Sequence, residues 1–249
     1  MLQSVKTALQ VFETLAQEQP IGVSDLARLM GLNKSTVQRC LLTLHDVGWI
    51  RPIGDGATKW ILTARILSLG SCIADGAHLT HAALPVMERL RDATEETIHL
   101  AVMDARDSVL LERLESRQPV RIFYPVGSRV PLNASATGKA ILSRLPEQQL
   151  EAFLAQPLDR VTERTIADAD RLRDELRTVQ AQGWAAAIDE LGHGASAIAA
   201  PILTPAGDSA AALSISGPTA RFGPETREKY AKLIVQAARE VSDRMYGVR

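Results

Sequence analysis

The chain has 249 residues, which is long for one compact α/β unit but sufficient for a small module and a larger one, each with its own core. Hydrophobic residues make up 46% of the chain and charged residues 23%, a balance that excludes global disorder. The formal net charge of −1 excludes DNA binding driven by the overall field, so any DNA contact must depend on a local basic patch.

The sequence shows no sign of a membrane span, a secretion signal or a metal site. No apolar run approaches the roughly 18 residues that a membrane span needs, and the amino terminus lacks a signal-peptide pattern. The two cysteines, Cys40 and Cys72, lie far apart inside apolar helical patterns, and the histidines make no metal-ligand spacing with them or with one another. We therefore expect a cytoplasmic protein with reduced thiols, no metal, no cofactor and no membrane partner.

The amino-terminal part of the chain predicts three helices. Apolar residues recur at helical spacing over residues 4–17. A second helix begins at its cap Ser24 and ends at Gly31, and a third runs from its cap Asn33 to about His45. Two short helices separated by a tight glycine turn are typical of a helix-turn-helix.

The third helix presents an apolar face and a polar face. The apolar face consists of Val37, Cys40, Leu41 and Leu44. The polar face consists of Lys34, Ser35, Gln38, Arg39 and Thr43. These are hydrogen-bond donors and cations, which suit base edges and phosphates. A solvated helix face is the alternative, and the segment that follows favours DNA binding.

Residues 49–53 and 58–61 predict two strands closed around Gly54-Asp55-Gly56, because Asp-Gly is a strong hairpin signal. The hairpin would form a wing, on which Arg51 and Lys59 can reach a phosphate or the minor groove. We therefore predict a winged helix-turn-helix over residues 1–62. Its candidate DNA-binding residues are Lys34, Ser35, Thr36, Gln38, Arg39, Arg51 and Lys59.

A narrow apolar stripe follows the hairpin and predicts a linker helix over residues 63–77. The stripe consists of Leu62, Ile66, Leu69 and Ile73, at a spacing that suits packing against another helix, so the linker would also help to pair subunits. Beyond it, a helix is predicted over residues 85–94 with Pro85 in its first turn. Strand-like runs follow at residues 98–103, 109–114 and 121–126.

The rest of the chain alternates between helices and strands. Helices are predicted over residues 136–145, 147–155 and 168–182, and a closing helix begins at Pro224. Strands are predicted over residues 184–188, 197–203 and 210–216. This mixture predicts an α+β domain over residues 78–249, a sheet with helices packed on it.

Two glycine-containing segments resemble nucleotide-binding motifs only superficially. Residues 133–140 have Asn133 and Ala140 where a phosphate-binding loop needs glycine and a hydroxyl residue, and residues 192–197 precede a strand where a dinucleotide fingerprint follows one. Nor does any nucleophile, base and orienting residue occur at a recognisable spacing. We therefore expect no enzyme activity.

Two other features indicate a binding site. Strand alternation places the hydroxyls of Ser214 and Ser216 on one sheet face, where a ligand can partner them. The free N–H groups at the start of the predicted helix, around Ala136, Thr137 and Gly138, could hold a carboxylate or another oxygen. An ordinary capped helix is the alternative for this second feature.

Several motifs resemble the IclR family of bacterial regulators. Residues 31–39, followed by Leu41, Leu44 and Gly48-Trp49-Ile50, resemble its winged-helix domain. Further segments resemble its effector domain in the family's order, at residues 131–140, 182–184, 199–202 and 213–218. The resemblance covers essentially the whole chain, and ordered, spaced motifs are far more specific than any one of them.

The resemblance implies a GAF-like effector domain with an antiparallel sheet and flanking helices. In the family, the effector lies between two strands and the start of the helix near Ala136. The corresponding residues here are Ala136, Thr137, Gly138, Ala187, Ala197, Ser214 and Ser216. Family members that bind small oxo-acids carry an acidic residue where Ala187 stands and a cysteine where Ala197 stands. The more apolar cavity implies a larger or aromatic acid.

We therefore expect a ligand-responsive regulator, and specifically a repressor of a catabolic operon. It would bind double-stranded operator DNA with palindromic symmetry as a homodimer or homotetramer, and a small organic acid would be its effector. Two alternatives stay open. One is a DNA-binding scaffold that senses a partner protein, and the other is an enzyme that carries a winged-helix module.

Overall fold

The structure is a computed structural model that describes residues 2–54, 58–70 and 74–247. The chain forms two compact units, Met1–Ala74 and Asp75–Arg249. Among the described residues, no helix is long and apolar enough to cross a membrane.

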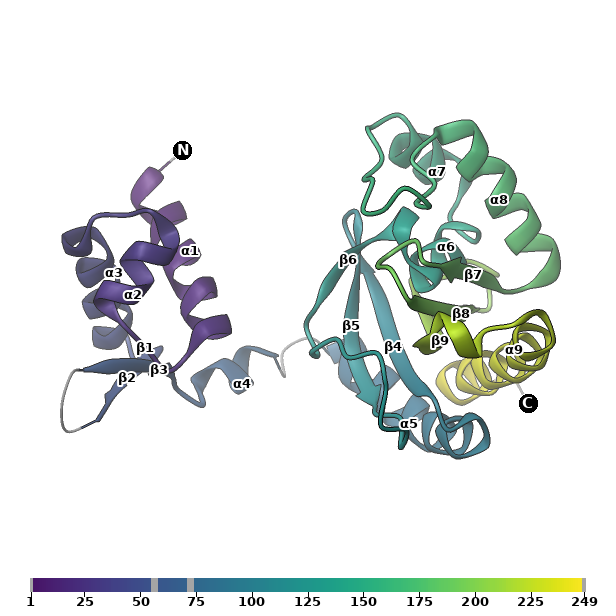
Figure 1. The fold of residues 1–249 in the computed structure, drawn as a ribbon, viewed down its shortest axis with the longest axis horizontal. Helices are drawn as coiled ribbons and strands as arrows, with labels where there is room; N and C mark the ends of the chain where they lie inside the picture. The colour runs from purple at the N-terminus through teal and green to yellow at the C-terminus, as the bar shows by residue number, and fades with distance from the viewer. Residues whose placement is uncertain (1, 55–57, 71–73, 248–249) are drawn as a thin grey trace. The chain divides into compact units, whose positions relative to one another are not determined.

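The first unit contains a three-helix module with a small sheet (Figure 1). Its helices are α1 (Gln3–Glu18), α2 (Val23–Met30), α3 (Lys34–Asp46) and the short α4 (Arg65–Gly70). Its strands are β1 (Ile21–Gly22), β2 (Ile50–Ile53) and β3 (Lys59–Leu62), which form an antiparallel sheet in the order β1-β3-β2. The buried core of this unit consists of Val11, Leu15, Leu26, Ala27, Val37, Leu41, Ile50 and Trp60.

The predicted helices and hairpin of this unit are present, with local differences. α2 begins one residue before Ser24, after Gly22, and it has no side-chain cap. Gly31 ends α2 with φ +63, and Asn33 occupies the N-cap position of α3 without a side-chain hydrogen bond. β1 was not predicted, because two residues are too short to show a period. The predicted turn residues 55 and 56 lie outside the described residues.

The second unit contains a six-stranded antiparallel sheet in the order β6-β5-β4-β9-β8-β7. Its strands are β4 (Thr97–Asp104), β5 (Asp107–Leu114), β6 (Arg129–Pro131), β7 (Ala185–Ile188), β8 (Ala195–Ile202) and β9 (Ala211–Pro218). Its helices are α5 (Ala74–Thr94), α6 (Ala136–Leu142), α7 (Glu147–Leu154), α8 (Ala169–Gln182) and α9 (Pro224–Tyr246), with short 3-10 turns at Leu132–Ala134 and Thr219–Arg221. This architecture confirms the predicted α+β class.

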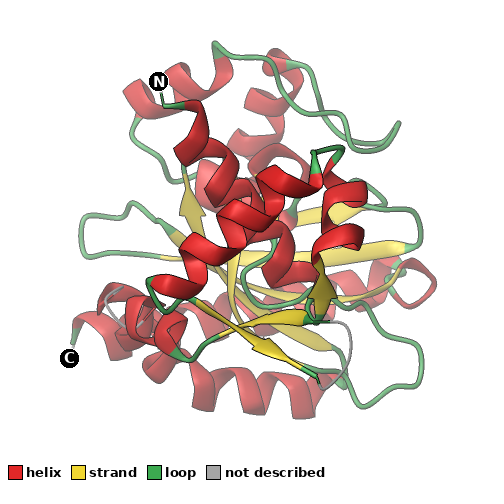
Figure 2. Cartoon of the chain, turned by 90° about the vertical axis from the view of Figure 1, so that its left-hand side faces the viewer, coloured by secondary structure: helices red, strands yellow, loops and turns green. Residues whose placement is uncertain are grey.

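Helices cover both faces of this sheet (Figures 1 and 2). α5 and α9 pack on the face that presents Ile98, Ile198 and Ile215. α6 and α8 lie against the opposite face, which presents Ala187 and Ala199. Because side chains alternate along a strand, Ser214 and Ser216 share this second face.

Two predicted elements of this unit were wrong. Pro85 does not lie in a first turn, since α5 begins at Ala74 and contains the proline in its interior. Residues 121–126 form no strand. Their alternation is real, with Ile122 and Tyr124 partly buried, but these side chains pack over the sheet and the backbone joins no ladder. The sheet continues instead at β6, which pairs with β5.

The stretch predicted as one linker helix, residues 63–77, includes α4 and the first residues of α5. Residues 71–73 between them, including Ile73 of the predicted stripe, lie outside the described residues. Leu69 is exposed, and Leu62 and Ile66 are partly buried.

Candidate functional site

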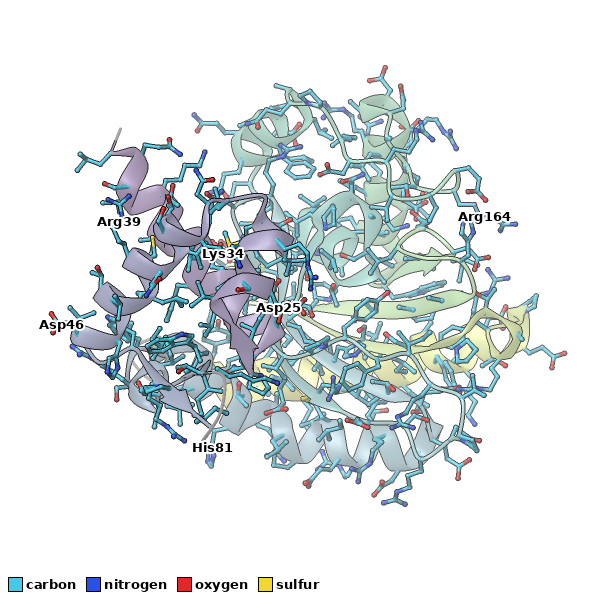
Figure 3. All side chains as sticks on the ribbon, turned by 60° about the vertical axis from the view of Figure 1, so that its left-hand side comes forward. Asp25, Lys34, Arg39, Asp46, His81 and Arg164 are labelled. Carbon is cyan, nitrogen blue, oxygen red and sulfur yellow. The ribbon has the colours of Figure 1, made fainter. Side chains whose placement is uncertain are left out.

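The outward face of α3 carries most of the predicted DNA-binding residues. Val37 and Leu41 are fully buried and fix which face of the helix meets the core. Lys34 and Arg39 are consequently exposed (Figure 3). Ser35 and Gln38 are exposed as well. Helical spacing places these residues in two neighbouring columns, with Lys34 before Gln38 in one and Ser35 before Arg39 in the other. Thr36 is only half-buried and lies at the edge of this face.

The hairpin places its two cations on a common face. Arg51 pairs with Ile61, and Lys59 pairs with Ile53. Alternation therefore directs Arg51 and Lys59 to the same side, opposite the side on which Trp60 enters the core. Both cations are exposed.

The four cations of the α3 and hairpin surface have no intramolecular partner within the described part of the chain. Neither Lys34 nor Arg39 forms a side-chain hydrogen bond or ion pair there, and the same holds for Arg51 and Lys59. Arg28 of α2 differs, because its guanidinium lies 2.7 Å from a carboxylate oxygen of Asp25. Unpaired exposed cations are available for phosphates without first breaking a salt bridge.

A cavity lies in the second unit between the sheet and α6. Its empty space is about 610 Å³, which includes its opening to the solvent. All six strands of the sheet contribute side chains to its wall, and the loop over residues 115–128 covers part of it. The lining residues are His99, Ala101, Ser108, Leu110, Ile122, Tyr124, Ser128, Val130, Ser135, Ala136, Thr137, Ala187, Leu191, Ala195, Ser196, Ala197, Ser214 and Ser216.

Six of the seven predicted effector-binding residues line this one cavity: Ala136, Thr137, Ala187, Ala197, Ser214 and Ser216. The seventh, Gly138, is absent from its wall. A Cβ atom at Gly138 would lie 2.1 Å from the carbonyl oxygen of Leu132, so glycine is needed here for close backbone packing. Ser135 caps α6, and its Oγ accepts a hydrogen bond from the N–H of Gly138 at 3.0 Å.

Sequence reasoning missed several polar residues of the cavity wall, above all His99 and Tyr124. His99 is 6% exposed, and its Nδ1 lies 3.2 Å from Oγ of Ser216. The rings of His99 and Tyr124 meet edge to face with their centroids 6.3 Å apart. The sequence signal that could have identified His99 was its alternation with Ala101 on a predicted strand. That signal does not show that β4 lies beside β9, which only the strand order of the sheet reveals.

His99 is neutral at ordinary pH. Burial, reinforced by the nearby charge of Arg113, lowers the pKa of His99 from 6.5 to about 4. Arg113 lies directly opposite His99 in the β4–β5 ladder. None of the residues that line the cavity therefore carries a formal charge at neutral pH.

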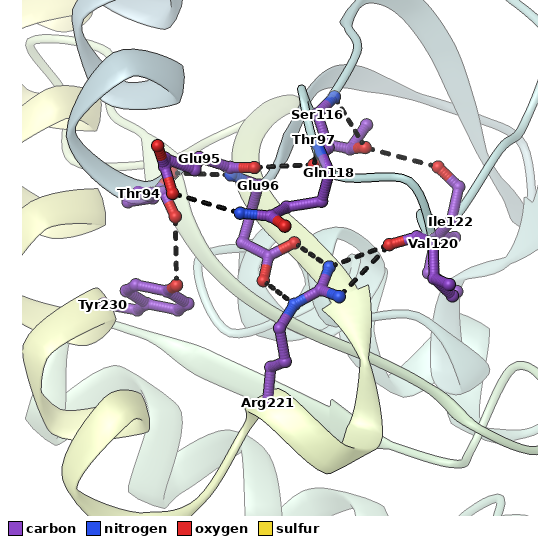
Figure 4. A network of polar contacts seen from close by, with 10 residues as sticks. All are labelled: Thr94, Glu95, Glu96, Thr97, Ser116, Gln118, Val120, Ile122, Arg221 and Tyr230. Atoms are coloured by element: carbon purple, nitrogen blue, oxygen red, sulfur yellow. Dashed lines mark hydrogen bonds and ion pairs between the residues drawn. The ribbon is translucent and has the colours of Figure 1, made fainter.

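The loop over residues 115–128 is tied to the sheet by a partly buried polar network (Figure 4). The carboxylate of Glu96 accepts two hydrogen bonds from Arg221, at 2.5 and 2.6 Å, and Arg221 also donates to the carbonyl oxygen of Val120. The hydroxyl of Thr97 donates to the carbonyl oxygen of Ile122. These contacts hold in place the segment that brings Ile122 and Tyr124 to the cavity.

The described residues contain no cluster of histidine, cysteine, aspartate and glutamate that could hold a metal ion. His78 and His81, three residues apart on α5, are both exposed.

Comparison with known proteins places both units in one family. Residues 4–54 match the model of the IclR helix-turn-helix domain, and residues 72–243 match the model of the C-terminal domain of the bacterial transcriptional regulator IclR. The relatives are named as transcriptional regulators.

Three similar proteins span almost the whole chain. The HTH-type transcriptional regulator KdgR of Escherichia coli is 32% identical over 246 residues, which cover 97% of this chain and 93% of KdgR. The acetate operon repressor of Salmonella typhimurium is 29% identical, with 100% and 92% covered. A crystal structure of an IclR homologue from Microbacterium hydrocarbonoxydans, complexed with 4-hydroxybenzoate, is 28% identical with a TM-score of 0.81, and 97% and 98% of the two chains are covered.

The helix-turn-helix module and the C-terminal domain thus match together, in the same order and over nearly the full length. The chain belongs to the IclR family of bacterial transcriptional regulators.

Proposed function

We propose that this regulator is a repressor of a catabolic operon and that a small aromatic acid controls its binding to a palindromic operator. Residues 1–62 bind the DNA, residues 63–77 link the domains, and residues 78–249 bind the effector. The observation that carries the sensor proposal is the uncharged, largely apolar cavity beside α6.

The DNA-binding half of the proposal is supported by the unpaired cations of α3 and the hairpin. Lys34, Gln38 and Arg39 would face base edges and phosphates in a major groove, and Arg51 and Lys59 would contact the neighbouring backbone. A dimer would place two copies of α3 in successive grooves, about 34 Å apart. Each bound cation releases counterions, so we expect operator affinity to fall steeply with salt.

Exposed apolar residues in the first unit support a homodimer or homotetramer. Leu2, Val5 and Leu9 recur at helical spacing along the start of α1 and are 74%, 52% and 56% exposed. On α4, Leu67 is 74% exposed. Burying these side chains against a second copy would remove apolar surface from water.

The size and polarity of the cavity support an aromatic acid over a two- or three-carbon acid. Ala187 and Ala197 both line the cavity and leave its wall apolar at these points. The empty space of about 610 Å³, which includes the opening to the solvent, leaves room for a single six-membered ring. The homologue from Microbacterium hydrocarbonoxydans, which is complexed with 4-hydroxybenzoate, is a precedent for a ligand of this size.

A thermal-shift screen tests the effector class. The panel contains benzoate, 4-hydroxybenzoate, gluconate, pyruvate and glyoxylate. A ligand at 100 times its dissociation constant adds roughly 2.7 kcal/mol to the free energy of unfolding, which raises the melting temperature measurably. We expect the aromatic acids to stabilise the protein most. Tightest binding by pyruvate or glyoxylate would contradict the proposed class, and silence across the panel would favour a scaffold that senses a partner protein.

Selection of binding sites from random-sequence duplex DNA tests the proposed binding to a palindromic operator. The purified chain should enrich a palindrome, and the stabilising acid should change the affinity for it. Enrichment of a site without two-fold symmetry would contradict the proposed dimeric binding, and unchanged affinity in the presence of the acid would contradict its role as the effector.

A further inference from the structure

The hydroxyl groups of the cavity differ in how far they are already satisfied. Oγ of Ser108 and Oγ1 of Thr137 lie 2.9 Å apart, and Oγ of Ser196 lies 2.9 Å from Oγ1 of Thr219. Oγ of Ser135 accepts the hydrogen bond that caps α6. These pairs satisfy one another within the wall, so they gain less from a ligand than an unpartnered group does.

Among the described residues of this wall, only His99 has a polar side-chain atom that is both closed off from solvent and unpaired. Its Nε2 is shielded from solvent and has no hydrogen-bond partner among the described residues. Leaving a buried polar nitrogen unpaired costs about 1–3 kcal/mol, and a ligand that supplies the missing partner recovers that cost.

The neighbours of His99 indicate which kind of group it would meet. The hydroxyl of Ser216 lies within hydrogen-bond reach of Nδ1 and can donate to it, which leaves the single ring proton of the neutral imidazole on Nε2. Nε2 is then a hydrogen-bond donor and requires an acceptor.

The surrounding charge favours an anionic acceptor. Arg113 faces the same region from β5, and its guanidinium also contacts the carbonyl oxygen of Tyr124 at 2.5 Å and Glu115 at 2.9 Å. Glu115 is partly exposed, whereas the cavity wall itself contains no carboxylate that would repel an anion. Tyr124, the other titratable residue of the wall, stays neutral because burial raises its pKa.

We propose that His99 anchors the effector's carboxylate through Nε2, at the β4–β9 side of the cavity. The apolar body of the ligand then extends toward Leu110, Ala187 and Ala197. This inference rests on the proposed function and adds to it the residue that selects a carboxylate and the direction in which the acid lies.

Paired ligands and paired variants test the assignment. The probes are benzoate with benzamide, and 4-hydroxybenzoate with 4-hydroxybenzamide, titrated calorimetrically into the full chain. His99→Leu removes the donor, and His99→Gln retains an N–H donor on a side chain of similar length. His81→Leu, at an exposed position of α5, is the matched control.

We expect the wild-type chain to bind each acid more tightly than its amide. His99→Leu should lose about 10- to 100-fold in affinity for the acid and lose the preference over the amide, as expected for removing one hydrogen bond to a charged group. His99→Gln should recover part of the affinity for the acid and part of the preference over the amide, and His81→Leu should match the wild type in both quantities. A circular-dichroism melt of each variant separates loss of binding from loss of folding.

The possible outcomes distinguish a failure of the His99 assignment from a failure of the proposed effector class. Wild-type affinity in His99→Leu, or equal wild-type affinity for acid and amide, would overturn the role of His99 and leave the effector class standing. If His99→Leu fails to fold, the folded His99→Gln variant decides by its acid-over-amide ratio, which must fall below that of the wild type. Failure of both acids to bind the wild-type chain would overturn the effector class and this inference together.

Discussion

The ammonium of Lys139 lies 2.7 Å from a carboxylate oxygen of Glu190, in a largely buried ion pair. The side chain of Lys139 is 1% exposed, and that of Glu190 is 11% exposed. The pair connects α6, which supplies Ala136 and Thr137 to the cavity wall, to the β7–β8 loop, which supplies Leu191. Glu175 of α8 makes a second contact with the ammonium at 3.3 Å.

Replacing Lys139 by methionine should strongly destabilise the second unit. Burial already raises the pKa of Glu190, opposed by the charge of Lys139, so removal of the lysine leaves a buried carboxyl group without its counter-charge. We expect a loss of about 3–5 kcal/mol in the free energy of unfolding, measured by urea denaturation. The double variant Lys139→Met/Glu190→Leu should recover most of it, because no buried charge remains. A single variant as stable as the wild type would show that the pair is dispensable.

Glu96 and Arg221 should stabilise the fold through the network that holds the 115–128 loop. Glu96→Gln keeps the shape but weakens two charge-assisted hydrogen bonds from Arg221, whose side chain is 33% exposed. We expect a loss of about 1–3 kcal/mol, reduced by solvent screening on the arginine side. The comparison is Arg28→Met, which removes the exposed ion pair with Asp25 and should leave the melting temperature unchanged. Equal melting temperatures for both variants would contradict a structural role for the network.

His99 should make stability fall as the solution becomes acidic. The pKa of His99 is about 4 in the folded chain and near its ordinary 6.5 when unfolded. Above pH 6.5 both states are neutral. Between pH 6.5 and 4 only the unfolded state takes up the proton, so folding loses roughly 3 kcal/mol over that window and no more below it.

The variant His99→Gln isolates this effect from the titration of the carboxylates. The difference in unfolding free energy between wild type and His99→Gln should change in favour of the glutamine variant as the pH falls from 6.5 to 4, and it should be constant above pH 7. Parallel stability curves over the whole range would mean that His99 is not kept neutral by the fold.

The sequence predicted local features and not the strand neighbours. The alternation of side chains along one strand placed Ser214 and Ser216 on a common face. Helical spacing placed Val37 on the apolar face of the third helix and Arg39 on its polar face. His99 could not be assigned in this way, because its approach to Ser216 depends on β4 lying beside β9, which joins segments far apart in the chain. Tyr124 was assigned to a strand, since alternation alone does not distinguish a ladder from a loop that packs its alternate side chains over a cavity.

Gly138 was predicted to bind the effector, and the structure indicates a packing role that spacing could not reveal. In Gly138→Ala the new Cβ would lie 2.1 Å from the carbonyl oxygen of Leu132 and 2.4 Å from its Cα. Backbone cannot give way as a flexible side chain does, so we expect a loss of about 3 kcal/mol or more. Gly70→Ala, with nothing within 4 Å of the added atom, is the control and should fold normally. A tolerated Gly138→Ala would mean that α6 can move away from Leu132.

The two functional surfaces should respond to substitution independently. Arg39→Ala removes an exposed, unpaired cation from α3, and a dimer loses it twice. We expect operator affinity to fall by about 30-fold or more, since each of the two lost contacts costs about 1–3 kcal/mol, with a shallower dependence on salt. Binding of the stabilising acid should be unchanged. Arg177→Ala, which removes an exposed cation of α8 that pairs with Asp174, controls for the change in net charge.

Ser214→Ala should have the opposite effect. Its hydroxyl is buried in the cavity wall, 3.5 Å from that of Ser216, so its removal should weaken binding of the acid while operator affinity without ligand stays at the wild-type value. Fluorescence anisotropy with the selected palindrome and calorimetry with the acid measure both quantities on each variant. If Arg39→Ala binds the operator as tightly as the wild type, the assignment of α3 to the DNA interface is wrong. If Ser214→Ala binds the acid as tightly as the wild type, this counts against the cavity as the effector site. If each variant impairs only its own ligand, the surfaces are separate sites, and any effect of the acid on operator affinity must be transmitted between the two domains.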